Sequence, residues 1–361
     1  YNVVGGYIGS TGLANNPPFR AVESFDALPG NTPSLNLSNP FPGTGSVPAV
    51  VNVNAVSANR VNGYMQQWNF TLEGEVAPNT AVRASYVGNK GTHLDRQLNL
   101  NDVVQAPGVV QLRRPFQPFG NIMYYDSERN SILNQLQVGV LRRLSKGLSF
   151  QVEYQLSKGL SEQPFGISAP TDFRNYKYDR GDMDSIRRHL TTSNYTYDLP
   201  FGKGRTFALS GLTNTLLGGW QLAGILSFGT GEPYSVTFTP NVTGWAASRA
   251  DIVGNPTPSN RSIAQWFNPA AYAVPQVFTF GNSARNSLFG PNLFRWDNGF
   301  IKNTKITERL NLEFRAEFFN ILNHPSFDVP ASNISVPSQV GRVTGTVSTA
   351  RDVQFGMRLS F

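Results

Sequence analysis

Apolar and polar residues alternate strictly in several segments of this chain, and this alternation restricts the folds that the chain can adopt. The clearest case is segment 352–361. One face would carry Val353, Phe355, Met357, Leu359 and Phe361, and every residue between them is small or polar. A period of two places successive side chains on opposite faces of a β-strand. Segments 148–157 and 310–320 follow the same pattern, so we expect an all-β fold of long strands.

Less regular versions of the pattern mark the other expected strands. They lie near 65–76, 80–88, 132–143, 189–199, 219–229 and 293–304, and the closing strand spans about 350–361. This makes nine strands, with a tenth candidate near the start. Alternation alone fits both a membrane barrel and a soluble sandwich. Length favours the barrel, because strands of about ten residues cross an apolar band of about 25 Å, whereas strands in soluble proteins are usually nearer five or six.

The connections between these strands alternate in length. Segments 76–80, 143–148 and 304–309 are tight turns, and 199–219 is moderate. The others, near 89–131, 159–188, 230–292 and 321–349, are each roughly thirty residues or longer. An antiparallel up-and-down transmembrane β-barrel with short periplasmic turns and long extracellular loops has this pattern. The last strand would then descend, which places Phe361 at the short-turn rim.

Composition excludes several other classes. The chain has no cysteine, which removes disulfides, zinc–cysteine sites and thiol catalysis, and it has no apolar run of the roughly 18 residues that a membrane helix needs. The net charge is +7, but the basic residues are scattered and no nucleic-acid-binding signature accompanies them. We therefore expect no nucleic-acid partner. The chain opens on Tyr1 without a signal peptide, so we expect a fragment or a processed product.

The sequence contains no convincing motif for phosphate binding, metal binding or catalysis. Gly88–His93 lacks the spacing of a phosphate-binding loop and is expected to be a strand-exit turn, and Phe201–Arg205 is expected to be a turn with its basic residues near lipid headgroups. The three histidines have no metal-binding spacing, and no Gly-x-Ser-x-Gly motif is present. We expect no metal, no cofactor and no catalysis.

Charged residues on the strands have two interpretations. The pairs Glu73 and Glu75, and Glu313 and Glu317, would each share a face and could serve acid–base chemistry. The favoured interpretation is a solvated lumen wall, in which Glu313, Arg315 and Glu317 can pair with Arg351, Asp352 or Arg358 on the last strand. The residues expected to face the lumen and to contact plug or substrate are Arg83, Glu153, Glu313, Arg315, Glu317 and Arg358.

Aromatic residues fall mainly in the strand segments, often near their ends. They are Trp68, Tyr86, Tyr154, Tyr195, Tyr197, Trp220, Trp296 and Phe300. In a soluble fold they would form a core, and in a barrel they would form the girdles at the two membrane interfaces. The asymmetry of the loops favours girdles.

The end of the chain resembles the assembly signal of bacterial outer-membrane β-barrel proteins. The residues that carry this resemblance are Gln354, Gly356, Leu359 and Phe361. It implies that the barrel assembly machinery is a partner and that Phe361 is needed for assembly.

Several sequence motifs resemble the carboxy-terminal barrel of TonB-dependent, Oar-like outer-membrane receptors of the acidobacterial type. These motifs are Ser85–Leu94, Tyr197–Gly204, Gly218–Gln221 and Phe314–Pro325. Two further segments, Phe267–Ala271 and Phe280–Ser283, resemble extracellular loop motifs of that group. The resemblance covers about residue 64 to the end. It implies a 22-stranded barrel with a plug domain energised by TonB. Compared with that pattern, we expect this chain to lack the plug, the TonB box and about half of the strands.

These observations lead to one interpretation with two alternatives. Residues 1–63 are expected to be rich in extracellular loop with one strand at most, and residues 64–361 to form barrel strands. The function expected from the resemblance is energy-coupled uptake of an unidentified substrate across the outer membrane of a Gram-negative cell. The alternatives are a passive porin or adhesin barrel, and a secreted β-sandwich binding protein whose apolar faces are buried inside.

Overall fold

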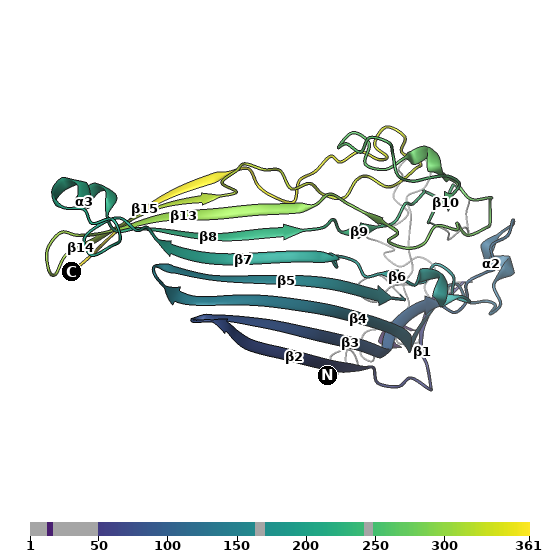
Figure 1. The fold of residues 1–361 in the computed structure, drawn as a ribbon. Coiled ribbons are helices and arrows are strands. Elements are labelled where there is room, and N and C mark those ends of the chain that lie inside the picture. Colours follow the sequence, from purple (N-terminus) through teal and green to yellow (C-terminus); the bar gives the residue numbers. More distant parts are fainter. Residues whose placement is uncertain (1–12, 17–49, 163–169, 242–247) are drawn as a thin grey trace, which may run out of the picture.

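Nine long antiparallel strands form one curved sheet in the computed structural model, which describes residues 13–16, 50–162, 170–241 and 248–361 (Figure 1). The strands are β2 (Tyr64–Ala77), β3 (Thr80–Asn99), β4 (Ile122–Ser145), β5 (Leu148–Ser161), β7 (His189–Asp198), β8 (Trp220–Gly229), β13 (Leu293–Lys305), β14 (Asn311–Phe319) and β15 (Asp352–Ser360). Each pairs with the next long strand along the chain, in the order β2-β3-β4-β5-β7-β8-β13-β14-β15. The predicted antiparallel, up-and-down, all-β fold is confirmed.

The remaining elements are short and lie in the connections. They are η1 (Leu13–Asn15), β1 (Val53–Val56), α2 (Val110–Arg113), η2 (Tyr176–Asp179), β6 (Gly181–Asp182), α3 (Gly211–Leu217), β9 (Pro233–Tyr234), β10 (Asp251–Ile252), η3 (Pro269–Ala271), β11 (Tyr272–Ala273) and β12 (Leu288–Phe289). Within the described residues, no helix has the length and apolar character needed to cross a bilayer. The strand β1 runs parallel to the start of β4. The proposed boundary at residue 63 stays a prediction, since residues 1–12 and 17–49 lie outside the described part.

The register separates the sheet into an apolar and a polar face. Residues directly paired across strands share a face. One row of the apolar face runs Leu72, Ala84, Val138, Tyr154, Thr191, Phe228 and Phe294, and another runs Trp220, Lys302, Phe314 and Met357. All eight aromatics that were expected in the girdles lie on this face by register.

The apolar face is turned to the outside. Phe355 is 68 % exposed and Met357 is 72 % exposed. The buried hydrophobic clusters found in the described residues consist of residues from the long connections, not of two sheet faces packed together. A sandwich would need its apolar faces buried against each other. The arrangement is instead that of a membrane barrel wall, with lipid on its apolar side.

Short and long connections lie at opposite ends of the strands (Figure 1). In the turn between β4 and β5, Lys146 and Gly147 have φ values of 52° and 82°, which is the geometry that a tight hairpin of two residues needs. The connections carrying α2, β6 and β10 are at the other end, and the carboxy terminus lies at the short-turn end. The predicted alternation of connections is confirmed, and by the usual topology of such barrels the short-turn end faces the periplasm.

Two strands, β3 and β4, extend furthest beyond their predicted ends. β3 continues to Asn99 and β4 begins at Ile122, so the connection expected at 89–131 shrinks to 100–121. Gly88–His93, expected to be a strand-exit turn, instead lies inside β3, and the register shifts between Gly91 and Leu94 where His93 has a φ of 55°. This is a β-bulge. Beyond the membrane neither face of a strand has to be apolar, so the extensions lack the alternating pattern.

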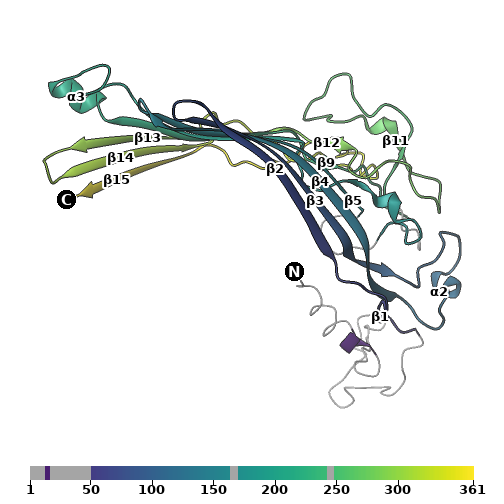
Figure 2. The same ribbon diagram turned by 60° about the horizontal axis from the view of Figure 1, so that its bottom comes forward.

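The sheet is open along β2 and β15 (Figure 2). In the described part of the chain, β2 pairs only with β3 and β15 only with β14. The outer edges of these strands therefore leave backbone donors and acceptors without partners in the sheet. The described strands form a curved wall and do not close a barrel.

Candidate functional site

The polar face of the wall carries all six residues that were expected to face the lumen. Arg83 on β3 lies in register with Gly139 on β4, which in turn lies in register with Glu153 on β5. The Arg83 guanidinium donates to the Glu153 carboxylate over 3.0 Å, across the whole width of β4. A Cβ atom at position 139 would lie 2.6 Å from a Glu153 carboxylate oxygen. Gly139, which sequence reasoning missed, leaves room for this ion pair.

The other lumen-facing candidates lie at the opposite side of the sheet. Arg315 pairs along its own strand, at 2.7 Å from Glu313 and 3.9 Å from Glu317. The register places Glu313 opposite Arg358. Among the described residues, no ion pair joins Glu313, Arg315 or Glu317 to Arg351, Asp352 or Arg358. Pairing with the last strand therefore stays a prediction. Contact of any of the six with plug or substrate stays a prediction.

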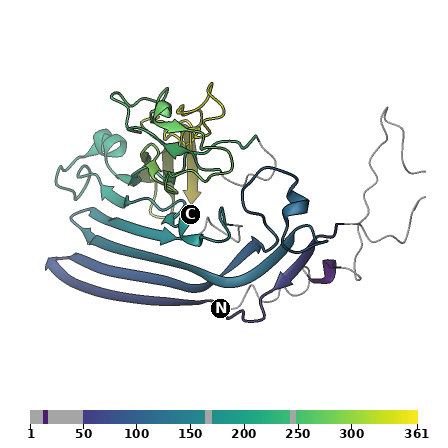
Figure 3. The ribbon, with the colours of Figure 1, turned by 90° about the vertical axis from the view of Figure 1, so that its right-hand side faces the viewer.

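At the long-loop end, two connections form a small folded unit, here called the outer subdomain and consisting of residues 230–241, 248–292 and 320–351 (Figure 3). Its core contains Tyr234, Val236, Ala250, Phe267, Ala271 and Tyr272. Backbone bonds such as Trp266 N–H to Gly341 O, at 2.7 Å, join the two connections. The loop motif Phe267–Ala271 supplies part of this core. The sequence analysis identified this motif as a loop but missed that the loop has a hydrophobic core.

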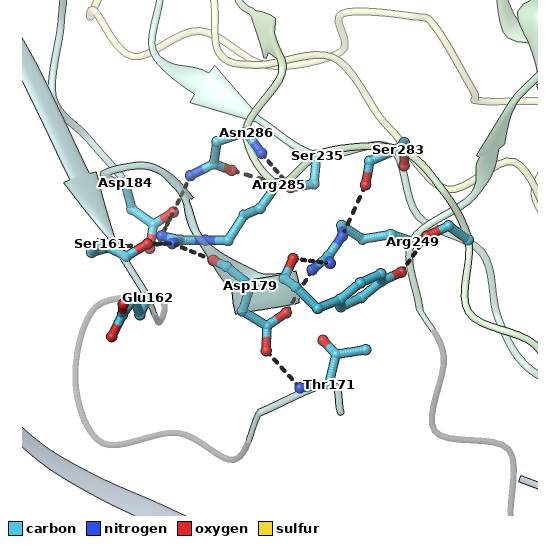
Figure 4. A network of polar contacts seen from close by, with 12 residues as sticks. Ser161, Glu162, Thr171, Asp179, Asp184, Ser235, Arg249, Ser283, Arg285 and Asn286 are labelled. Carbon is cyan, nitrogen blue, oxygen red and sulfur yellow. Dashed lines mark hydrogen bonds and ion pairs between the residues drawn. The ribbon is translucent and has the colours of Figure 1, made fainter. Parts of the chain in front are cut away.

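Arg249 fixes the outer subdomain to the connection between β5 and β7 (Figure 4). It is buried, and its guanidinium donates to the Asp179 carboxylate over 2.7 Å, to the Tyr178 carbonyl over 2.6 Å and to the Ser283 carbonyl over 3.1 Å. The same group lies 3.9 Å from the centre of the Tyr178 ring. Burial raises the pKa of the Tyr178 phenol, and the positive charge of Arg249 opposes this rise.

Arg285 ties the outer subdomain directly to the wall. Its guanidinium donates over 3.1 Å to both the hydroxyl and the carbonyl of Ser161, the last residue of β5, and it forms an ion pair of 3.1 Å with Asp184. Its neighbour Asn286 donates to the Asp184 carboxylate over 2.6 Å. We call Asp179, Asp184, Arg249, Arg285 and Asn286 the rim network. A buried charge is tolerated only when it is paired and hydrogen-bonded. The buried charges of this network, Asp179, Arg249 and Arg285, each have an opposite charge and hydrogen bonds.

A second group of buried arginines ties the same connection to β3 and β4. Arg96 donates to Asp126 over 2.7 Å and to Glu128 over 2.8 Å, and the Tyr176 ring lies 4.5 Å from its guanidinium. Arg129 is fully buried beside the same ring, at 5.8 Å, and donates to the Glu162 carbonyl. The outer loops are therefore held on the strand ends from two sides.

The histidines and the residues of the expected assembly signal do not belong to the rim network. His93 contacts the Ser127 carbonyl, His189 the Tyr154 hydroxyl and His324 the Phe294 ring. The described residues contain no cluster of three or more histidine, cysteine or acidic residues that could hold a metal. Gln354, Gly356 and Leu359 lie on β15, and Phe361 follows it fully exposed. Their role in assembly stays a prediction.

The wall and the loops fixed to its end together form a scaffold that could present a binding surface. The wall offers a polar surface on one side and lipid contact on the other, and buried ion pairs hold the outer subdomain and the 170–188 connection to the strand ends. Loops that a rigid scaffold holds in place are the usual carriers of binding residues. The members of the rim network that bond to each other across the loops are 70 to 106 residues apart in the chain, so no local sequence signal could have revealed them.

Three solved structures are similar to this chain. The outer membrane transporter YddB from Escherichia coli aligns with a TM-score of 0.50 at 9 % identity, over 86 % of this chain and 34 % of its own. The FrpB iron transporter from Neisseria meningitidis aligns at 0.41 and 11 % identity, over 86 % and 33 %. P. aeruginosa FpvA bound to a heterologous pyoverdine–iron complex aligns at 0.39 and 7 % identity, over 82 % and 27 %.

The chain thus spans about a third or less of the solved structures that it matches. No curated protein matches it. A family model described as an outer membrane beta barrel domain matches residues 1–354, which is nearly the whole chain. The outward apolar face, the alternating connections and this match lead to the same conclusion: the chain belongs to the outer membrane beta-barrel family and resides in the cell outer membrane.

Proposed function

We propose that this chain is the carboxy-terminal part of a TonB-dependent receptor of the Oar-like type, and that it serves energy-coupled uptake. In this proposal the sheet supplies part of the barrel wall, the outer subdomain supplies binding surface, and a plug domain elsewhere in the parent protein receives energy from TonB. The chain catalyses no reaction in this scheme. The substrate is unidentified.

One observation carries the proposal most directly: the long loops are fixed to the wall by the rim network. A passive pore needs only a wall and an open lumen. A receptor that captures a scarce substrate benefits from an outer surface whose shape is already ordered before binding, because less conformational freedom is then lost. Arg249 and Arg285 provide this order by joining loops that are far apart in the chain.

The sequence motifs Ser85–Leu94 and Phe314–Pro325 support the assignment to the Oar-like, TonB-dependent type, because they resemble motifs of those receptors. The open edges of β2 and β15 support the expectation that further strands complete the barrel. Lumen-facing Arg83 and Glu153 are suitably placed to contact a plug, since they lie on the polar face of the wall.

The test uses the full-length parent protein, because the proposal places the plug outside this chain. Reconstituted into a planar bilayer with potassium chloride on both sides, it should show no steady conductance, since the plug fills the lumen. A steady open-channel current would overturn the proposal in favour of a passive porin. In cells, a photo-crosslinker placed in the amino-terminal part should capture TonB, and failure to capture it would overturn energy coupling.

A further inference from the structure

The connection between β7 and β8 at the short-turn end differs from the other turns there, because it contains the helix α3 and exposes large apolar side chains. Leu212 is 82 % exposed and Leu216 is 67 % exposed. Phe201 and Phe207 stack on each other at 5.5 Å between ring centres, and both are also exposed. An exposed apolar patch on a folded protein usually marks a contact surface.

The helix is held from one side, which leaves its apolar side free. Asn214 accepts a hydrogen bond of 2.8 Å from the backbone N–H of Lys203, so this side of α3 lies against the turn at 201–205. At 100° per residue, Leu212 and Leu216 lie roughly opposite Asn214. The two leucines therefore point away from the turn that supports the helix.

Contacts at the end of α3 place the helix on the lipid side of the wall. The Trp220 indole donates to the Leu216 carbonyl over 3.0 Å, and the Lys302 ammonium donates to the Gly218 carbonyl over 2.7 Å. Trp220 and Lys302 are paired in register and lie in the same row of the apolar face as Phe314 and Met357. The patch on α3 is thus continuous with the membrane-facing surface of the barrel. Figures 1 and 2 show α3 set off from the plane of the strands at the short-turn end.

The charge of this connection fits one particular neighbour. Residues 199–219 include Lys203 and Arg205 and no acidic residue. Arg205 pairs with Asp198 at 3.0 Å, whereas Lys203 is exposed and forms no ion pair with any described residue. Tryptophan is enriched at the level of lipid headgroups, and basic residues near a membrane surface are attracted to anionic headgroups.

From these four observations we infer that α3 and the Phe201–Phe207 pair form an interfacial foot, a surface that lies in the periplasmic leaflet and contacts phospholipid. The occupant of the patch is lipid: the leucines and phenylalanines enter the boundary between headgroups and acyl chains, and Lys203 contacts headgroup phosphates. Helices of this kind lie in the plane of the interface with their apolar side buried. The inference rests on the outer-membrane location, not on the proposed uptake function.

The test measures the surroundings of a probe on the foot in the full-length parent protein. The chain contains no cysteine, so an environment-sensitive fluorophore can be attached at a single site, Leu216→Cys, with any cysteine elsewhere in the parent replaced by serine. The matched control is Glu308→Cys, an exposed residue in the neighbouring turn between β13 and β14. Both are reconstituted into vesicles of phosphatidylethanolamine and phosphatidylglycerol that carry bromine on the acyl chains near the headgroup.

The probe at position 216 should show blue-shifted emission and strong quenching by the brominated lipid, while the probe at 308 should be quenched mainly by iodide in the water. Adding Lys203→Glu should reduce the quenching at 216 in phosphatidylglycerol vesicles and change it little in vesicles without anionic lipid. Quenching of the 216 probe by iodide to the same degree as at 308 would overturn the inference. So would a probe that neither quencher reaches, because a protein partner would then cover the patch.

Discussion

Single glycines on β3 and β4 decide where two large side chains can lie, and the same substitution should have different effects at the two sites. A Cβ atom at position 88 would lie 2.0 Å from the Trp68 indole, which is rigid, whereas one at position 139 would meet the movable carboxylate of Glu153. We expect Gly88→Ala to destabilise the barrel by about 1–3 kcal/mol through overpacking. Gly139→Ala should cost less than about 1 kcal/mol, because it displaces an exposed ion pair.

The measurement is the denaturant midpoint of unfolding of the full-length parent in detergent micelles, followed by tryptophan emission. Adding Trp68→Phe to Gly88→Ala should recover part of the lost stability, since the smaller ring leaves room for the new methyl group. Equal midpoints for Gly88→Ala and Gly139→Ala would contradict the explanation.

Arg249 is the residue on which the order of the outer loops depends most. Replacing it with methionine leaves the Asp179 carboxylate buried without its counter-charge, and breaking a buried pair in this way costs about 3–5 kcal/mol. The matched control is Arg295→Met, which removes a pair with Asp297 in which the arginine side chain is 45 % exposed, and it should have little effect. Limited proteolysis of the folded parent should then cut the outer subdomain of Arg249→Met much faster, with the barrel intact. Unchanged cleavage would show that the rim network does not order the loops.

At the scale of elements, the strands that cross the membrane could be predicted from the sequence, whereas the structure outside the membrane could not. All nine spanning strands were predictable, because a strand in lipid must keep one face apolar along its length, as in Val353 to Phe361. The extensions of β3 and β4, with the bulge at His93, carry no such pattern because they leave the bilayer. The core around Phe267 was missed because irregular backbone has no period to detect, and the rim network because its partners are distant in the chain.

The core of the outer subdomain should make its stability sensitive to alkaline pH. Burial raises the pKa of Tyr234, with the neighbouring Tyr272 adding to the rise, and burial also raises the pKa of Tyr272. The folded state thus holds these protons more tightly than the unfolded state, whose tyrosines titrate near their usual value of about 10. The free energy of unfolding should be unaffected by these groups below about pH 10 and should fall as pH rises above it.

Tyrosinate absorbance and Trp266 emission should therefore change together in one cooperative step above that pH. Neither hydroxyl has a hydrogen-bond partner in the described part of the chain. Because a buried unsatisfied hydroxyl is unfavourable, the double variant Tyr234→Phe, Tyr272→Phe should be at least as stable at neutral pH and should unfold at higher pH. A transition at the same pH in the double variant would assign the alkaline step to other groups.

At the scale of the whole molecule, the wall is complete in its faces but not in its circumference. Lipid can cover the apolar face and water the polar face, but lipid cannot hydrogen-bond the free edges of β2 and β15. In the hydrocarbon region no water is present to hydrogen-bond an unpaired strand edge, and each unsatisfied group costs several kcal/mol. Fourteen residues of β2 and nine of β15 present such edges. Closure must therefore come from strands outside the described sheet.

This chain expressed alone should consequently fail to form a stable barrel. After refolding into detergent or vesicles, it should run at one position in gel electrophoresis whether heated or not, and trypsin should digest it throughout. The full-length parent, refolded in parallel, should shift its position on heating and keep a protected core, which shows that the conditions permit folding. Because unpaired edges also template association between chains, the isolated chain should aggregate as detergent is removed. A heat-modifiable, protease-resistant species from this chain alone would mean that its edges find partners within one copy or between copies, and that no further strands are needed.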